Sequence, residues 1–400
     1  MTKKFIYDSS EFVTTDLTEF RSFVAEREKN QKWFTDEDNT KADMVRFMPV
    51  FPEPLCVPSE VDQLRRNKMV KFTSSEDAYT DTMYSPEFGV YGSTQLICVN
   101  GELYPVGMSA VRGIISRAGT AMEGFEKLRT RNPQKLSENL NNYLSETDGS
   151  LCVLVGDEKV RAVNSGRYAI CSIGFVLEAT FDWISKEYPQ AFFVDGYYCH
   201  DFASWDIDLS AYTNEILGQF QELVHGGFKP ALRVTLSNTA KSSVSLKPCL
   251  RLASAIFPVG ESIDCPHIKK GCASERTLEM EETIRKNFSL VFPSLTALAA
   301  DINDLKNVTV NNASNALLRG MKKLALPKQQ ALEAQEQFAM IFADISTAYD
   351  CFLSVVDTYT FVIRDNPNDP KKIFASADAV GRAVKIEWRQ LGSFPGDFSW

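Results

Sequence analysis

The alternation of apolar and polar residues predicts short strands in the first two thirds of the chain and long helices after them. Residues 151–168, LCVLVGDEKVRAVNSGRY, hold two apolar runs around a Gly-Asp-Glu-Lys turn, which is the pattern of a β-hairpin. A second hairpin is predicted over 94–108, where Asn100-Gly101 supplies residues that tolerate positive φ. Strand pairs are expected over 191–210. Two or three further strands are expected over 229–260, on either side of the polar turn SNTAKSS.

Apolar residues at helical spacing predict the helices. One helix begins after Ser109, a suitable N-cap, and an amphipathic one over 173–189 ends at Pro189. The remaining predicted helices lie at 133–144, at 275–305, from Pro327 to Val362 and around 377–392. The stripe Phe338, Met340, Phe342, Tyr349, Phe352 and Tyr359 is apolar enough to be core or an oligomer contact.

This order of elements predicts an α+β fold, in which antiparallel β-hairpins and a twisted sheet are flanked by helices and followed by a helical C-terminal region. We expect an irregular N-terminal region over 1–100, an α+β core domain over 101–310 and the helical region over 311–400. The chain of 400 residues is 44% hydrophobic and 24% charged, which is enough apolar sequence for more than one core.

The composition also bears on location. No run of eighteen apolar residues occurs, and the N-terminus is polar, so we expect neither a membrane span nor a secretory signal. Nine cysteines, an odd number spread widely, favour reduced thiols over disulfides. The sequence therefore predicts a cytoplasmic protein that does not associate with membranes.

Charge is distributed unevenly around a formal net value of −9. From Glu178 to Glu222 there are nine acidic residues against one basic residue, whereas from Lys229 to Lys286 there are ten basic residues against six acidic ones. A partner that carries phosphates would be repelled by the first segment and attracted by the second.

Arginine forks suit phosphate oxygens, and aromatic faces stack on bases. The candidate nucleic-acid-binding residues are Arg161, Arg167, Tyr168, Lys241, Lys247, Arg251, Lys269 and Lys270.

Three segments carry a resemblance to a known family. YPVGMSAVRGIISRAGTAMEGFEKL, NLNNYL and LCVLVGDEKVRAVNSGRYA, with Leu250-Arg251-Leu252 and His267 further on, resemble the "phage/plasmid-like protein" family, which contains a domain of unknown function. The resemblance covers about residues 100 to 305. The family is similar in its hairpin-and-helix order to phage single-strand annealing recombinases, which form rings or filaments along DNA. The resemblance therefore implies a homo-oligomer that acts on single-stranded DNA.

The candidate metal-binding and catalytic residues do not have the spacing of a known motif. Cys249, Cys265, His267 and Cys272 include zinc-ligand types, but they lack the paired Cys-x-x-Cys spacing. Cys199 and His200 are adjacent, so on a strand they point to opposite faces and do not form a catalytic pair. No nucleotide-binding, zinc-protease or hydrolase motif occurs. We therefore expect no catalytic residue, metal ion or cofactor.

Three functional hypotheses follow. The first is a mobile-element nucleic-acid-binding protein that anneals or coats single-stranded DNA without catalysis. The second is a phage or plasmid structural or host-interaction protein that uses the acidic 178–222 segment as its contact surface. The third is a metal-dependent nuclease that uses Asp195, Asp201, Asp206 and Asp208, although the same aspartates also fit a solvated acidic face.

Overall fold

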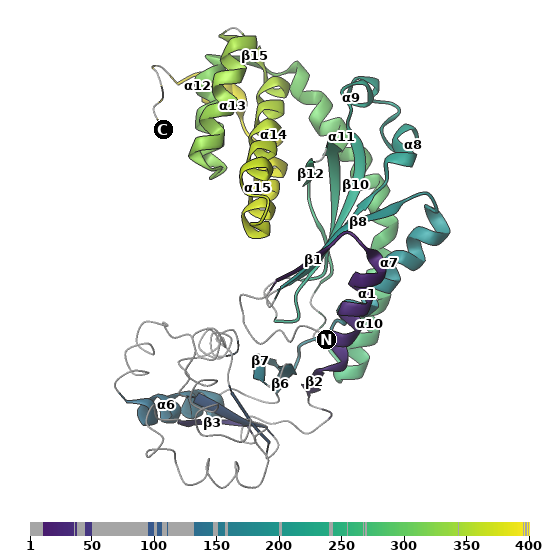
Figure 1. Ribbon diagram of the computed structural model, residues 1–400, viewed down its shortest axis with the longest axis vertical. Coiled ribbons are helices and arrows are strands. Elements are labelled where there is room, and N and C mark those ends of the chain that lie inside the picture. The colour runs from purple at the N-terminus through teal and green to yellow at the C-terminus, as the bar shows by residue number, and fades with distance from the viewer. Residues whose placement is uncertain are drawn as a thin grey trace.

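The computed structural model describes residues 11–35, 37, 45–49, 95–99, 102–105, 110, 132–146, 151–156, 159–199, 202–239, 243–253, 255–266, 268, 270–342, 344–394, 396, 398 and 400. Its helices and antiparallel sheets form the predicted α+β fold (Figure 1). The helix expected after Ser109 lies outside the described residues except for Ala110, which is helical.

The largest sheet has seven antiparallel strands and confirms the strands expected over 191–210 and 229–260. Its order is β1-β8-β9-β10-β11-β12, and β13 pairs with one end of β11. The strands are β1 (Glu11–Thr14), β8 (Phe192–Cys199), β9 (Ala203–Asp208), β10 (Lys229–Leu236), β11 (Ser245–Leu252), β12 (Ala255–Pro258) and β13 (Ile263–Asp264). The short helices α8 (Thr213–Leu217) and α9 (Gln221–His225) connect β9 to β10.

One face of this sheet is covered by helices and holds the main hydrophobic core (Figure 1). Trp205 and Leu232 point into it from neighbouring strands, and both are fully buried together with Phe20. A Cβ atom at Gly196 would lie 2.6 Å from the Phe20 ring, so only glycine lets this helix residue approach the strand. The covering helices are α1 (Leu17–Lys29), α7 (Ile173–Glu187), α10 (Ala273–Asn287) and α11 (Val291–Asp304).

The N-terminal region is not irregular throughout, because β1 and α1 belong to the layers of the main sheet. Both predicted hairpins are present in smaller sheets, ordered β2-β6-β7 and β3-β4-β5. Their strands are β2 (Gln31–Phe34), β6 (Leu151–Gly156), β7 (Lys159–Ser165), β3 (Val45–Pro49), β4 (Gln95–Val99) and β5 (Glu102–Pro105), and the predicted helix at 133–144 is α6 (Pro133–Glu146).

The C-terminal region is helical, as predicted, and its helices α14 and α15 pack beside β12 (Figure 1). The helix expected from Pro327 to Val362 is interrupted by a short strand that pairs with β14, after which a capping box of Thr347 and Asp350 starts a new helix. The elements are β14 (Thr309–Asn311), α12 (Ala313–Lys323), α13 (Lys328–Ile341), β15 (Ile345–Thr347), α14 (Ala348–Asp365), α15 (Pro370–Ala383) and α16 (Trp388–Gly392).

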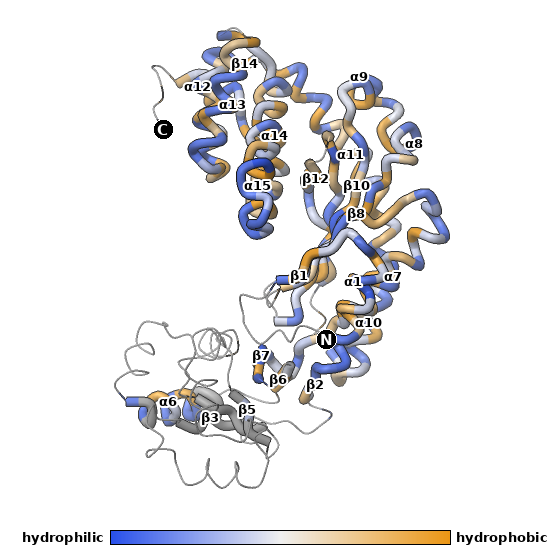
Figure 2. The backbone as a smooth tube through the Cα atoms, in the orientation of Figure 1, coloured by the Kyte–Doolittle hydropathy of each residue, from blue (hydrophilic) through white to orange (hydrophobic). Residues whose placement is uncertain are grey.

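Figure 2 shows hydrophobic and hydrophilic residues mixed along the helices. Within the described part of the chain, no helix combines the length and the apolar character that crossing a membrane requires. Among the described residues, the free thiols are Cys152, Cys171, Cys199, Cys249, Cys265, Cys272 and Cys351.

Candidate functional site

The second face of the main sheet, opposite the core, carries charged side chains. Side chains alternate between the two faces along each strand. Arg233 therefore lies on the same face as its cross-strand neighbours Asp206 and Lys247, and Arg251 lies opposite Lys229 four positions further along. The same face also holds a small apolar cluster of Ala231, Cys249 and Ile256 beside these charges.

A buried ion pair lies at the centre of this face. Arg233 Nε donates to Asp206 Oδ1 at 2.7 Å and Nη2 donates to Oδ2 at 2.6 Å, which is the bidentate geometry of a strong charge-assisted pair. Both side chains are 4% exposed. The Phe374 ring covers the guanidinium at 4.6 Å. Arg233 Nη1 is buried and has no hydrogen-bond partner among the described residues.

Asp195 stands next to this pair on β8, just after a β-bulge between Phe193 and Asp195. Burial raises the pKa of its carboxyl to about 7, and the negative charge of Asp206 adds to the rise, while Arg233 opposes it. No described residue donates a hydrogen bond to Asp195. Its carboxyl is therefore poised between the protonated and ionised forms near neutral pH.

Asp195, Asp206 and Arg233 line a cavity of about 240 Å³ between the sheet and the α14–α15 hairpin. Strand residues form its floor and helical and loop residues form its roof. The other lining residues are Val13, Val194, Tyr197, Ile256, Tyr359, Ile363, Pro367, Pro370, Ile373 and Phe374. The Tyr359 hydroxyl donates to the Ile256 carbonyl at 3.1 Å, which ties the roof to β12. The cavity is thus apolar around a small charged centre.

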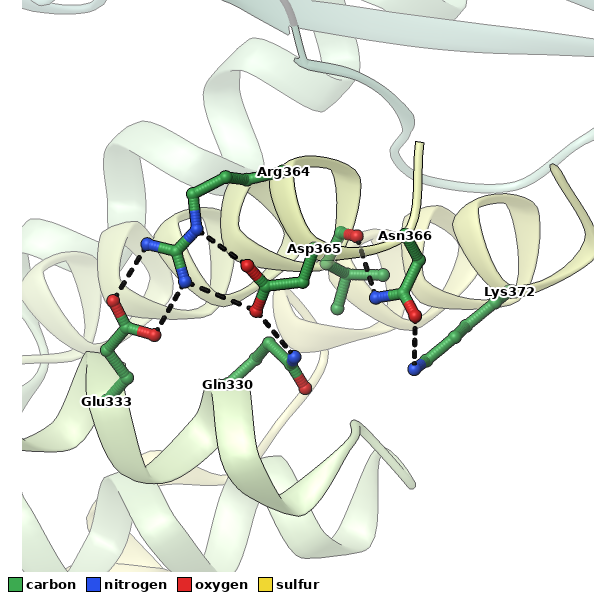
Figure 3. Close-up of polar contacts among 7 residues, drawn as sticks. Gln330, Glu333, Arg364, Asp365, Asn366 and Lys372 are labelled. Atoms are coloured by element: carbon green, nitrogen blue, oxygen red, sulfur yellow. Dashed lines mark hydrogen bonds and ion pairs between the residues drawn. The ribbon is translucent and has the colours of Figure 1, made fainter. Parts of the chain in front are cut away.

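A polar network fixes the turn that forms part of the roof (Figure 3). Arg364 binds Glu333 of α13 through Nη1 and Nη2 at 2.9 and 2.8 Å, and its Nε binds the neighbouring Asp365 at 2.7 Å. Asn366 Nδ2 caps α14 by donating to the Val362 carbonyl, and Lys372 Nζ donates to Asn366 Oδ1 at 2.8 Å. These contacts hold the end of α14 and the start of α15 in place beside the cavity.

The predicted cationic residues of the main sheet are engaged by carboxylates. Arg251 Nη1 pairs with Asp208, and Arg251 Nε donates to the Ala253 carbonyl at 2.8 Å. Lys247 Nζ pairs with Asp378 of α15 at 3.1 Å. The main sheet therefore brings Lys247 and Arg251 together on one face, but each is partly neutralised there.

The hairpin residues lie on the separate sheet β2-β6-β7. Arg161 is 1% exposed and does not reach the surface. It lies across Gly156, where a Cβ atom would be 3.0 Å from Arg161 Cδ. Arg167 is exposed. Tyr168 is partly buried, stacks on Trp33 with ring centroids 5.8 Å apart, and donates its hydroxyl to the Ser237 carbonyl.

The remaining candidates are scattered. Lys270 is exposed, whereas Lys241, Lys269, His200, Asp201 and His267 lie outside the described residues. Cys265 is buried and accepts from Asn287, and Cys272 lies at the start of α10 beside Ser274. Within the described part of the chain, no three histidine, cysteine or acidic residues lie close enough to hold a metal ion. Asp206 and Asp208 are instead paired with arginines.

The sequence indicated Asp195 and Asp206 as members of an acidic segment and as candidate metal ligands, and it did not indicate Arg233, Tyr359 or Phe374 as site residues. The available signal was a charged residue inside an apolar strand, LRVTL over 232–236, which predicts a buried partner of opposite charge.

Comparison with family models found no match, and neither the curated proteins nor the solved structures gave a significant match.

Proposed function

We propose that the protein binds single-stranded nucleic acid without catalysis, as a mobile-element protein in the cytoplasm. The observation that carries this proposal is the partly exposed Trp33–Tyr168 stack, with the exposed Arg167 directly before Tyr168 in the chain. We call these three residues the aromatic–arginine surface. It combines the two groups that sequence-independent binding of single strands uses, an aromatic face and a cation.

The proposed surface is smaller than the sequence predicted. Arg161 stays buried, and Lys247 and Arg251 are paired with carboxylates on another sheet. Binding therefore depends on stacking, worth about 1–3 kcal/mol per base, and on a single exposed arginine. With an acidic chain around it, this surface is expected to bind weakly and to lose affinity as salt rises.

The test is fluorescence anisotropy of a labelled oligothymidylate titrated with the full chain at low and at moderate salt. Arg167→Glu should weaken binding about tenfold at low salt, because it replaces a phosphate contact with a repulsive charge. Trp33→Ala should weaken it by a similar factor and leave the salt dependence unchanged, since it removes stacking and no charge.

Lys323→Glu is the matched control, because Lys323 is exposed on α12 and makes the same change in net charge. A thermal melt of each variant shows whether it is folded. An equal loss of affinity in Arg167→Glu and Lys323→Glu would show that the loss comes from the change in net charge alone. It would refute binding at the aromatic–arginine surface. No binding by the folded wild-type chain at low salt would refute the function.

We also propose that the chain self-associates. The supporting observation is a set of large apolar side chains that stay exposed at the end of α13 and on β15: Met340 at 85%, Ile341 at 74% and Ile345 at 64%. Coating a strand requires contacts between neighbouring copies, and exposed apolar residues close together favour such contacts.

A further inference from the structure

The cavity between the main sheet and the α14–α15 hairpin contains three polar groups that the described protein residues leave unsatisfied. Arg233 Nη1 and the Tyr197 hydroxyl are buried without a hydrogen-bond partner, although the rest of the Arg233 guanidinium is engaged. Asp195 carries a carboxyl that receives no hydrogen bond from the described residues. Leaving a buried donor unpaired costs about 1–3 kcal/mol, so such a group in a cavity points to a ligand.

The charges indicate what the ligand carries. Asp206 and Arg233 neutralise one another, so an ionised Asp195 leaves the cavity with one net negative charge. Glu11, which interacts with the lining residue Tyr197, is paired with Lys371 at 3.1 Å, so this pair adds no net charge. A cationic group on the ligand would compensate Asp195, and an oxygen acceptor would take the free Arg233 Nη1 donor.

The walls indicate the rest of the ligand. Val13, Val194, Ile363, Ile373 and Phe374 surround the charged centre with apolar surface. We propose that this cavity binds a small molecule with an ammonium group, an oxygen acceptor and a short apolar body, the chemical class of the aliphatic and aromatic amino acids. The ammonium group pairs with Asp195, the carboxylate accepts from Arg233 Nη1, and the side chain packs under Phe374.

This site is distinct from the aromatic–arginine surface, because it lies on the seven-stranded sheet rather than on β2-β6-β7. It goes beyond the proposed function, and its failure leaves nucleic-acid binding untouched. The roof of the cavity comes from α14, α15 and the turn fixed by Arg364 and Asn366 (Figure 3), so a bound ligand also joins the C-terminal helices to the sheet.

The experiment is isothermal titration calorimetry of the full chain at pH 8 with leucine, valine and phenylalanine, each compared with the matching amine and carboxylic acid. At least one amino acid should bind with a dissociation constant in the millimolar range or below. The matching amine and acid should each bind at least about tenfold more weakly, because each carries only one of the two charged groups of the amino acid.

Two variants locate the binding. Asp195→Asn should weaken it about tenfold or more by removing the ionic partner, whereas Asp182→Asn, the same change at an exposed position on α7, should leave it unchanged. Val13→Trp places a large side chain at the cavity mouth, where Val13 is 56% exposed, and should block entry without disturbing the core. Thermal melts verify that each variant is folded.

The proposal is overturned if none of the three amino acids binds at millimolar concentration. It is also overturned if folded Asp195→Asn and Val13→Trp bind as the wild type does, or if the amine alone binds as tightly as the amino acid.

Discussion

At the scale of single residues, Asp195 makes the stability of the fold depend on pH. Its pKa is raised from 3.8 to about 7 in the folded chain, chiefly by burial. Between these two values the folded state holds more protons than the unfolded state, so this residue lowers the free energy of unfolding as pH rises from about 4 to about 7. Above pH 7, the folded chain would be more stable with a neutral side chain at this position.

We therefore expect Asp195→Asn to be more stable than the wild type at pH 8, by roughly 2–4 kcal/mol as an upper range, and to differ little from it near pH 4. The measurement is urea unfolding of both proteins at several pH values. The charges of Asp206 and Arg233 act on this carboxyl in both proteins, and Tyr197 lines the same cavity, so the difference between the two curves isolates Asp195. Parallel curves would contradict the assignment of a raised pKa.

The Asp206–Arg233 pair makes a different prediction. Removing one partner of a buried pair leaves an uncompensated charge, whereas replacing both with apolar residues of similar volume is often neutral. Asp206→Asn should therefore destabilise the chain by about 3–5 kcal/mol, and the double variant Asp206→Leu with Arg233→Met should be less destabilised than the single one.

Chemical denaturation of the two variants and the wild type checks this order. A double variant that is less stable than Asp206→Asn would mean that the pair contributes more to the fold than its desolvation cost. In that case the buried pair would be a source of stability rather than a feature kept for the cavity.

The sequence indicated which residues carry charge, but it did not indicate which residues they contact. It grouped Asp206 and Asp208 with acidic residues and Arg251 with a cationic set, although the structure pairs Asp208 with Arg251 and Asp206 with Arg233. Those pairs depend on the register between β9, β10 and β11, which the connections between these strands decide. A period-2 pattern gives the face of each strand but not its register.

At the scale of elements, the spacing of apolar residues predicted most helices and strands, because it depends only on residues close together in the sequence. The hairpins β4–β5 and β6–β7 and the helix α7 lie where it placed them. It missed the break between α13 and α14, although the polar residues Ser346 and Thr347 of β15 interrupt the apolar stripe there. Pairing of β15 with β14 ends α13 there, and this pairing is a contact distant in sequence.

The crossing of α12 and α16 depends on one glycine. A Cβ atom at Gly320 would lie 2.5 Å from the buried ring of Trp388, so the helices can meet only without a side chain there. Gly320→Ala should destabilise the chain by about 1–3 kcal/mol, even though alanine favours helix formation. Urea unfolding measures this change.

Trp388→Phe combined with Gly320→Ala is the matched control, because the smaller ring leaves room for the methyl group. The double variant should be destabilised by less than the sum of the two single changes. Additive effects would show that the Gly320–Trp388 approach does not limit the packing.

At the scale of the whole molecule, the α+β class was predictable and the cavity was not. Its lining residues come from β1, β8, β9, β10, β12, α14 and α15, which span residues 13 to 374. Only the packing of the C-terminal helices beside β12 brings these elements together. Two of the three residues of the proposed aromatic–arginine surface, Arg167 and Tyr168, were indicated by the sequence, and Trp33 was not.

Self-association is the last expectation at this scale. Burying Met340, Ile341 and Ile345 between copies would remove apolar surface from water, at about 25 cal/mol per Å². Light scattering after size-exclusion chromatography should give a mass above that of one chain, and the variant with all three residues changed to serine should move toward the monomer. Leu278→Ser, at an exposed apolar position on α10, is the control and should keep the assembly. A wild-type chain that stays monomeric at every concentration would show that the strand-coating function cannot rest on contacts between these residues.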